Sequence, residues 1–504
     1  MASGSAPVQS TKPSVAHPEI EIIGHPRGLW MLFGSEFWER FAYYGMRAFL
    51  AIYVAQAFFG QMDKADAQEQ ASLAYGGYTA LVYMTGIIGG FVADRILGYQ
   101  RSIMLGGALM AAGLFMLMAP DLTTFLIGLA LIVVGNGLFK PNISTMVGKL
   151  YAPGDVRRDS GFTIFYMGIN AGALIAPIIC GTLIGARFGY QWGFFTAGIG
   201  MVFGITVFQF LKHWLHGVGR VPAGREGFSG VALVLVGALV LVGPVYFLLS
   251  KSDVLGGVLV VGMLALAGYF IYSGVRTSRE QRDRYVAMLI LFLANMCFWA
   301  LFEQAGSSLN FFAKDLTDLS FFGLVDIHYT LFQSINPLFI ILLAPMFAFA
   351  WPRLDRIAMN PSTPRKFALG LIQVALGFGA LVLAIAFFTG ADGKVHWFWL
   401  VLTYFLHTTG ELCLSPIGLA MVTRLARPEE TGLAMGGWFL SIAMANFLAG
   451  RFAALIGGHH AVDGTVGMAQ YATVFQQLFW MGLIFGAIYF ICAPLINKLM
   501  HGVR

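Results

Sequence analysis

The sequence predicts an all-α membrane protein with fourteen transmembrane helices, and three observations support this fold class. Of the 504 residues, 58% are hydrophobic and only 11% are charged, whereas soluble proteins carry about 25% charged residues. Long apolar runs recur along the whole chain, and the mean hydropathy is +0.74. The period-two alternation of a membrane β-barrel is absent.

The apolar runs divide the chain into segments that are long enough to cross a bilayer as helices. Most are separated by short polar loops with Gly, Pro or charged residues. We expect the spans at residues 28–58, 71–94, 102–119, 122–147, 160–185, 190–211, 229–250, 254–275, 285–311, 328–350, 367–390, 396–422, 432–457 and 471–496.

The distribution of basic residues over the loops predicts the orientation. Of the 31 Lys and Arg residues, 22 fall on the side of the N-terminus, six on the other side and three inside spans. Loops on the cytoplasmic side carry the excess of Lys and Arg, so we expect both termini in the cytoplasm and the chain in the inner membrane. The basic pI of about 9.1 reflects this bias and does not indicate nucleic-acid binding. Residues 1–27 are polar and predict a disordered cytoplasmic tail.

A weak internal repeat indicates two related halves. The second and tenth spans both end in Asp-Arg, at Asp94-Arg95 and Asp355-Arg356, on the predicted cytoplasmic side. Two parallel six-helix units are the plan of the major facilitator fold. We therefore predict one six-helix bundle over residues 28–215 and a second over 285–498. The two uncharged spans between them, within 229–275, predict an inserted transmembrane hairpin of unassigned role.

Charged residues inside the predicted spans are the strongest functional signal. A charge near the bilayer centre costs at least about 2.5–3.5 kcal/mol, so such residues mark a pathway for a charged substrate or for protons. The seven residues of this kind are Glu36, Glu39, Arg40, Arg47, Lys140, Glu303 and Glu411.

The depth of these charges predicts two pairs that join the halves. At 1.5 Å per residue, Arg47 and Glu303 lie about 25 and about 27 Å in from the cytoplasmic side. Lys140 and Glu411 lie about 27 and about 22 Å in from the outer side. Arg47 with Glu303 could close the outside and Lys140 with Glu411 the inside, as alternating gates require. The alternative is two static ion pairs that hold the bundle together.

The first span also predicts a basis for proton coupling. Glu36 and Arg40 are four residues apart and share a helix face. A nearby cation opposes protonation of a buried carboxylate. When a substrate carboxylate occupies the cation, Glu36 should therefore bind a proton more easily. A local ion pair without this role is the alternative.

Three segments resemble the proton-coupled oligopeptide transporters, the POT family of the major facilitator superfamily. Residues Glu36–Gly45 read EFWERFAYYG and resemble the family's ExxERFxYYG motif. The stretch around Asp94 resembles its second-helix motif, and Phe165–Gly172 resembles its FYxxIN motif. The resemblance covers roughly residues 28–498. The inserted hairpin is typical of bacterial members.

The resemblance implies a binding site for di- and tripeptides and a set of residues that move protons. Arg40, Arg47 and Lys140 would receive the peptide carboxylate, and Glu411 with Asn170 and Asn336 would receive its amino group. The matching pocket positions are Tyr43, Tyr44, Tyr83, Trp299, Ser415 and Trp438. Glu36, Glu39, Arg40, Arg47, Lys140, Glu303 and Glu411 match residues tied to proton movement and gating.

One departure concerns histidine. Animal members carry a functional histidine in the second helix, and none lies between Ala71 and Asp94 here. The proton would then rest on carboxylates. His407 lies one helical turn from Glu411, and we interpret it as a packing residue or as a residue with a capped polar contact.

The sequence thus predicts a proton-coupled symporter of di- and tripeptides that acts as a monomer in the bilayer, without a cofactor or metal. A related carrier of another anion, such as nitrate, is the first alternative, and an ion channel is the second. An enzyme is not expected, because HExxH, CxxC and GxSxG motifs are absent. The four cysteines lie in apolar segments and are expected to be packing residues.

Overall fold

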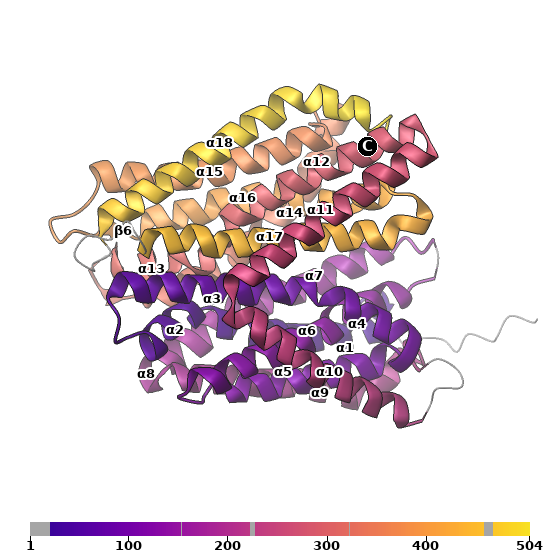
Figure 1. Ribbon diagram of the computed structural model, residues 1–504, viewed down its shortest axis with the longest axis horizontal. Helices are drawn as coiled ribbons and strands as arrows, with labels where there is room; N and C mark the ends of the chain where they lie inside the picture. The colour runs from indigo at the N-terminus through magenta and orange to yellow at the C-terminus, as the bar shows by residue number, and fades with distance from the viewer. Residues whose placement is uncertain (1–20, 153, 222–226, 322, 458–466, 504) are drawn as a thin grey trace, which may run out of the picture.

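A computed structural model describes residues 21–152, 154–221, 227–321, 323–457 and 467–503 (Figure 1). Long helices dominate these residues and run roughly along one direction, in two bundles that lie one above the other in Figure 1. Eleven helical segments among the described residues are long and apolar enough to cross a membrane. The other three expected spans fall on α1 with α2, on α5 and on α16, so the number of crossings stays a prediction.

The N-terminal bundle occupies the lower half of Figure 1. Within it, α5 packs on α6, and α1 packs on both α7 and α9. Its elements are α1 (Arg27–Arg47), α2 (Leu50–Phe58), α3 (Lys64–Met84), α4 (Gly86–Val92), η1 (Ala93–Leu97), α5 (Tyr99–Met116), α6 (Leu122–Lys149), α7 (Arg158–Ala176), η2 (Pro177–Gly185), α8 (Ala186–Phe188), α9 (Tyr190–Leu211) and η3 (Lys212–Leu215).

The C-terminal bundle occupies the upper half, where α15 packs on α16 and α18, and α12 packs on α17. Three two-stranded pairs complete the described structure: β1 with β2, β3 with β6 and β4 with β5. The elements of this half are α12 (Arg279–Phe302), η4 (Glu303–Gly306), α13 (Ser308–Asp315), β3 (Thr317–Asp318), β4 (Ser320–Phe321), β5 (Val325–Asp326), η5 (Tyr329–Ser334), α14 (Ile335–Arg356), α15 (Thr363–Phe387), β6 (Val395–His396), α16 (Phe398–Leu425), η6 (Pro428–Glu430), α17 (Thr431–Gly457) and α18 (Met468–Leu499).

Two expected elements differ in detail. The expected span 28–58 is interrupted between α1 and α2, where Phe49 leaves the helical conformation with φ −134° and ψ 7°. The expected disordered tail is too long, because β1 (Glu21–Ile22) and β2 (His25–Pro26) form a two-stranded pair before α1. Contacts with the bundle hold this pair, since the Tyr151 hydroxyl lies 2.8 Å from His25 Nδ1 and Trp30 Nε1 donates to the Ile22 carbonyl.

The inserted hairpin divides its contacts between the bundles. Helix α10 (Ser229–Ser250) packs on α6 and α3, whereas α11 (Ser252–Thr277) packs mainly on α12 and α17 and also touches α3. The two helices diverge from their connection, so that α10 lies over the lower bundle and α11 over the upper one (Figure 1). Glu430 ties α11 to the C-terminal bundle by accepting hydrogen bonds from Ser273 (2.6 Å) and Tyr269 (2.9 Å).

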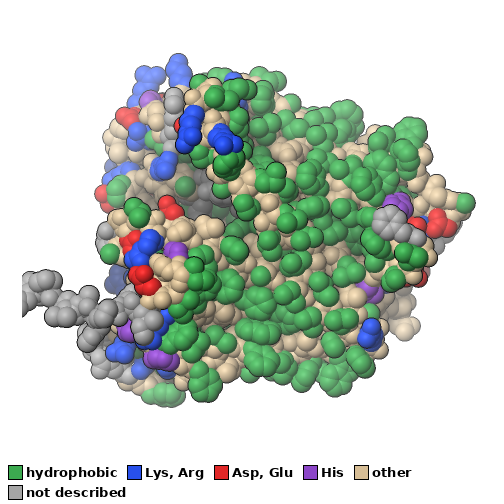
Figure 2. All heavy atoms as spheres, turned by 180° about the vertical axis from the view of Figure 1, so that it is seen from behind, with side chains coloured by type: hydrophobic (Ala, Val, Ile, Leu, Met, Phe, Trp, Pro, Cys, Tyr) green, Lys and Arg blue, Asp and Glu red, His purple; other side chains and the backbone are tan. Residues whose placement is uncertain are grey.

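Basic residues gather at one end of the molecule. Figure 2 shows Lys and Arg at its left edge and hydrophobic side chains over the middle of this face. We call this the basic end; α1 starts there at Arg27, and α12 starts there at Arg279. The side with Lys64 and Asp315 is called the opposite end. The apolar band between them is the surface expected to contact lipid.

The two bundles meet closely toward the opposite end. Helices α3 and α17 cross at Gly76 and Gly450, where a Cβ on Gly76 would lie 2.7 Å from the Gly450 Cα. Polar contacts support this closure: Thr182 with Thr330 (2.9 Å), Tyr190 with Tyr329 (2.6 Å), Ser334 with the Leu174 carbonyl (2.7 Å), Asn310 with the Ala48 carbonyl (2.8 Å), Gln68 with Tyr471 (2.9 Å) and Lys64 with Asp315 (3.1 Å).

Candidate functional site

Four charged residues of the N-terminal bundle form one cluster. Arg40 Nη2 donates to Glu39 (2.5 Å), and Arg40 Nε lies 3.5 Å from Glu36. Lys140 of α6 forms an ion pair with the same Glu36 oxygen. The Glu36 and Glu39 side chains are fully buried, whereas that of Lys140 is 31% exposed. Two carboxylates thus face two cations, and only one of the four charges reaches solvent substantially.

Helix α1 builds this cluster through its spacing. Glu36 and Arg40 lie one turn apart on one face, as the sequence predicts. Asn136 lies one turn before Lys140 on α6, and its amide reaches Glu39 at 3.4 Å. Glu36 Oε2 is buried and has no hydrogen-bond partner among the described residues. The cluster therefore retains one unused acceptor, on the carboxylate shared by Lys140 and Arg40.

The depths of Lys140 and Glu411 suggested that these two residues pair. In this structure they do not. Lys140 is bound to Glu36 of its own bundle, while Glu411 accepts a hydrogen bond from Asn336 at 3.0 Å. Depth along a helix fixes the level of a residue but not its neighbour at that level. For this reason, the depths alone could not show whether Lys140 pairs with Glu36 or with Glu411.

The expected pair between Arg47 and Glu303 is present and joins the bundles. The Arg47 guanidinium forms an ion pair with Glu303 and donates to the Tyr75 hydroxyl. Arg47 and Glu303 are 9% and 3% exposed. The pair closes the interface from the ends of α1 and α12, toward the opposite end of the molecule.

The Tyr43 and Tyr44 rings lie beside the cations. The Arg40 guanidinium lies 4.9 Å from the Tyr43 ring centroid and 5.9 Å from that of Tyr44. The Tyr44 ring also faces the Arg47 guanidinium at 5.8 Å. Arg47 in turn pairs with Glu303 of the other bundle. The Tyr44 ring therefore lies beside two cations, one of which pairs across the interface.

The C-terminal side of the site contains a carboxylate held by an amide. The Asn336 side chain donates to both Glu411 and Thr408 at 3.0 Å. Glu411 is 7% exposed on α16, and Asn336 lies in the first turn of α14. The Asn170 amide donates to the Tyr166 carbonyl of its own helix at 2.9 Å. The hydrogen bonds of Asn170 and Glu411 thus go to different partners, Tyr166 and Asn336.

The predicted pocket aromatics have different surroundings. Tyr83 is half-buried on α3, and Trp299 is half-buried with Phe302 at a ring distance of 5.1 Å. Trp438 is buried and packs between Phe292 and Phe367. The Ser415 side chain lies outside the described residues.

His407 is buried at 1% exposure, and neither of its ring nitrogens has a hydrogen-bond partner among the described residues. Its ring centroid lies 5.1 Å from that of Phe378 and 6.1 Å from that of Phe302. A Cβ on Gly377 of α15 would lie 2.6 Å from the ring. Its neighbours are mainly aromatic, and the role of His407 stays a prediction.

Three polar partners were missed in the sequence: Tyr75, Asn136 and Thr408. Asn136 was detectable, because an amide four residues before Lys140 shares its helix face. Tyr75 and Thr408 contact their partners across helices, and helix periodicity carries no signal for such contacts.

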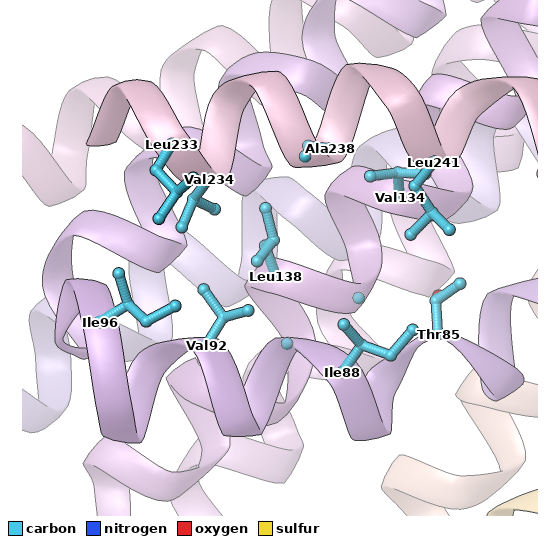
Figure 3. A pocket seen from close by; sticks show the side chains of 13 residues that line it. Thr85, Ile88, Val92, Ile96, Val134, Leu138, Leu233, Val234, Ala238 and Leu241 are labelled. Atoms are coloured by element: carbon cyan, nitrogen blue, oxygen red, sulfur yellow. The ribbon is translucent and has the colours of Figure 1, made fainter. Parts of the chain in front are cut away.

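A well-formed apolar cavity lies apart from the charged cluster. It has a volume of about 400 Å³ between α10, α4 and α6, and Figure 3 shows Val92, Leu138 and Val234 on its walls. No charged side chain is among the described residues that line it. It therefore lacks the groups that would bind a zwitterion. No group of three or more His, Cys, Asp or Glu suited to a metal ion occurs among the described residues.

Two helical bundles with opposite buried charges at their interface define a membrane transporter of the major facilitator type. The sequence profile of the POT family matches residues 100–472. The peptide transporter YePEPT of Yersinia enterocolitica is 38% identical over 95% of this chain and 96% of its own length. A di-/tripeptide transporter of Lactococcus lactis is 35% identical over 96% of this chain and 99% of its own length.

The comparison with solved structures agrees. The crystal structure of a peptide transporter POT in complex with alafosfalin is 38% identical, with a TM-score of 0.83 over 96% of this chain and 98% of that chain. The chain belongs to the POT family, whose members are transporters and not enzymes.

Proposed function

We propose that this protein carries di- and tripeptides into the cytoplasm together with protons. The observation that carries the proposal is the placement of buried charges of opposite sign in the two bundles. Arg40 and Arg47 lie in one bundle and Glu303 and Glu411 in the other, and Arg47 pairs with Glu303 across the interface. Short peptides differ in their side chains but share an amine and a carboxylate. A site with cations on one side and a carboxylate on the other orients any of them. The printed names of the relatives support the same substrate class.

The proposed binding mode assigns each end of the peptide to one bundle. Arg40 and Lys140 receive the carboxylate; Lys140 is the more exposed of the two at 31%. Glu411, oriented by Asn336, receives the amino group. Tyr43, Tyr44, Tyr83 and Trp299 provide surface for the side chains. A peptide bound in this way contacts both bundles and can draw them together.

Proton coupling follows from competition for Lys140. In this structure the Glu36 carboxylate forms ion pairs with both Lys140 and Arg40. A peptide carboxylate that takes these cations leaves Glu36 buried without compensation, and a buried carboxylate then favours its protonated form. The unused Glu36 Oε2 is available to the proton. Peptide and proton would thus bind together.

The conformation fits a carrier that faces the cytoplasm. The two bundles are joined toward the opposite end by Arg47 with Glu303 and by Thr182 with Thr330. Closer to the basic end, Lys140 forms an ion pair with Glu36 of its own bundle and therefore does not join the two bundles. The excess of basic residues at the basic end supports a cytoplasmic location of that end. We accordingly infer cytoplasmic termini, an inner-membrane location and a monomer as the functional unit.

Uptake of labelled dialanine into proteoliposomes tests this proposal. One proton that crosses 100 mV and one pH unit releases about 3.7 kcal/mol, which limits accumulation to about 500-fold. We expect accumulation only with an imposed gradient that drives protons inward. Lys140→Ala should abolish it, whereas Lys149→Ala, an exposed residue at the end of the same helix, should not. Equal accumulation without a gradient would contradict proton coupling.

Glu36→Gln separates binding from coupling. The amide cannot take up the proton, so we expect peptide counterflow to persist while accumulation driven by protons is lost. Concentrative uptake by Glu36→Gln at the level of the unsubstituted protein would exclude Glu36 as the coupling group.

A further inference from the structure

A cavity at the basic end, separate from the charged cluster, combines cations with an apolar wall. It lies between α5, α9 and the start of α10 and has a volume of about 860 Å³. Arg101, Lys212 and Arg220 line it, and no Asp or Glu is among the described residues on its wall. The cavity therefore favours an anion on electrostatic grounds.

The lining changes from charged to apolar within one helical turn. Arg101 lies in the first turn of α5, and Met104 and Leu105 follow it toward the membrane interior. Lys212 follows the last residue of α9, and Phe208 lies one turn deeper. One turn corresponds to about 5.4 Å along the axis. A ligand in this cavity meets cations at one level and hydrocarbon just below it.

The cavity also lies at the depth of a lipid headgroup. Helices α5, α9 and α10 all begin or end there, so it lies at the boundary between the membrane and water. Phe228, directly before α10, is 79% exposed at its rim, and Phe210 of α9 is 73% exposed nearby. Exposed aromatic side chains are favourable at the membrane interface.

Lys212 and Arg220 are the cations available to a ligand. Lys212 Nζ contacts the neutral Gln209 side chain at 3.0 Å, and both residues are exposed. The Arg220 backbone is fixed by the packing of its segment on α5, where Gln100 binds the Gly219 and Val218 carbonyls at 3.0 and 2.7 Å. The site is thus built on a braced segment, with its charges directed to the surface.

We propose that this cavity binds an anionic phospholipid of the membrane leaflet at the basic end. The phosphate would contact Lys212, Arg220 and Arg101, and the acyl chains would follow the apolar wall formed by Met104, Leu105, Phe208 and Val231. Basic pockets between transmembrane helices on the cytoplasmic side favour such headgroups. The lipid would join the first helix of the inserted hairpin to the N-terminal bundle.

Native mass spectrometry of the purified full chain tests the site. We expect phosphatidylglycerol to be retained roughly tenfold more strongly than phosphatidylcholine with the same acyl chains, because three basic residues act on the headgroup. The triple variant Arg101→Gln, Lys212→Gln, Arg220→Gln should lose this preference. The control variant Arg276→Gln, Arg279→Gln, Arg356→Gln removes three exposed charges from the ends of α11, α12 and α14 and should keep it.

Two further measurements distinguish a phospholipid site from a site for free phosphate and from non-specific lipid retention. Glycerol phosphate, which carries the headgroup charge without acyl chains, should not displace phosphatidylglycerol from the unsubstituted protein at equal concentration; displacement would mean a site for a free phosphate. Phosphatidylglycerol should also raise the melting temperature of the unsubstituted protein above that in phosphatidylcholine. Equal retention of both lipids by the unsubstituted protein, or unchanged preference in the triple variant, would overturn the proposal.

Discussion

The two levels of the central interface use the same chemistry in different ways. Toward the opposite end, Arg47 of one bundle pairs with Glu303 of the other, and close helix contacts surround the pair. Toward the basic end, Lys140 pairs with Glu36 of its own bundle. Both pairs join a cation to a carboxylate, yet only the first pair holds the halves together.

This difference indicates how the molecule can change conformation at low cost. A buried charge that loses its partner costs about 3–5 kcal/mol. Lys140 avoids most of this cost if it exchanges Glu36 for Glu411, because it remains paired in both states. We therefore propose that the alternation predicted from the depths of the charges is an exchange of Lys140 between Glu36 and Glu411, in which the peptide carboxylate competes for Lys140.

Removal of the Arg47–Glu303 pair, which joins the bundles, should destabilise the closed conformation more than any other substitution proposed here. Glu303→Ala leaves Arg47 buried at 9% exposure with Tyr75 as its remaining partner, and we expect a loss of about 3–5 kcal/mol in the closed conformation. Asp315→Ala breaks the partly exposed pair with Lys64 at the same end and should cost about 0–1 kcal/mol. Thermal unfolding in detergent and peptide uptake measure both; equal effects would mean that Arg47 with Glu303 is not a gate.

The contact between glycines at the α3–α17 crossing gives a second, smaller perturbation. A Cβ on Gly450 would lie 2.7 Å from the Ser72 carbonyl and 2.8 Å from the Gly76 Cα, so Gly450→Ala must separate the helices at about 1–3 kcal/mol. Gly86→Ala is the control, because nothing lies within 4 Å of its Cβ. Spin labels on both bundles at the opposite end should report a larger separation only for Gly450→Ala. No change in that separation would show that the crossing does not determine the closure.

A substitution outside both levels should have the smallest effect. His407 packs against Phe378 and Phe302 and contacts none of the charged residues. His407→Phe preserves a ring of similar shape, and we expect uptake within about twofold of the unsubstituted protein. A loss of proton-driven accumulation, with counterflow preserved, would instead assign a proton-carrying role to this residue.

The sequence predicted the depth of the site residues in the membrane better than it predicted which residues are neighbours at a given depth. The rise per residue in a helix placed Arg47 and Glu303 at one level, and the four-residue spacing placed Glu36 beside Arg40, as observed. The pair of Lys140 with Glu411 is not formed in this structure, where Lys140 pairs with Glu36, and it stays a prediction for the conformation closed at the basic end. Glu36 and Glu411 differ in their position around the site, which depends on helix packing. The interruption at Phe49 was missed because the apolar pattern continues through it.

The packing of the inserted hairpin was likewise not predictable from the sequence. Its two apolar spans were evident from composition, but the contacts of α10 with one bundle and of α11 with the other depend on tertiary packing. The Glu430 contacts with Ser273 and Tyr269 link residues more than 150 positions apart in the sequence. Patterns within single helices carry no information on such pairs.

A reversible cross-link at the opposite end tests the central claim, which is that the bundles must separate there during each transport cycle. The Thr182 and Thr330 hydroxyls lie 2.9 Å apart on different bundles, so Thr182→Cys with Thr330→Cys suits a disulfide. The single variants control for the native cysteines. Oxidation should abolish dialanine uptake by the double variant, and reduction should restore it. Undiminished uptake by the fully cross-linked protein would contradict the account.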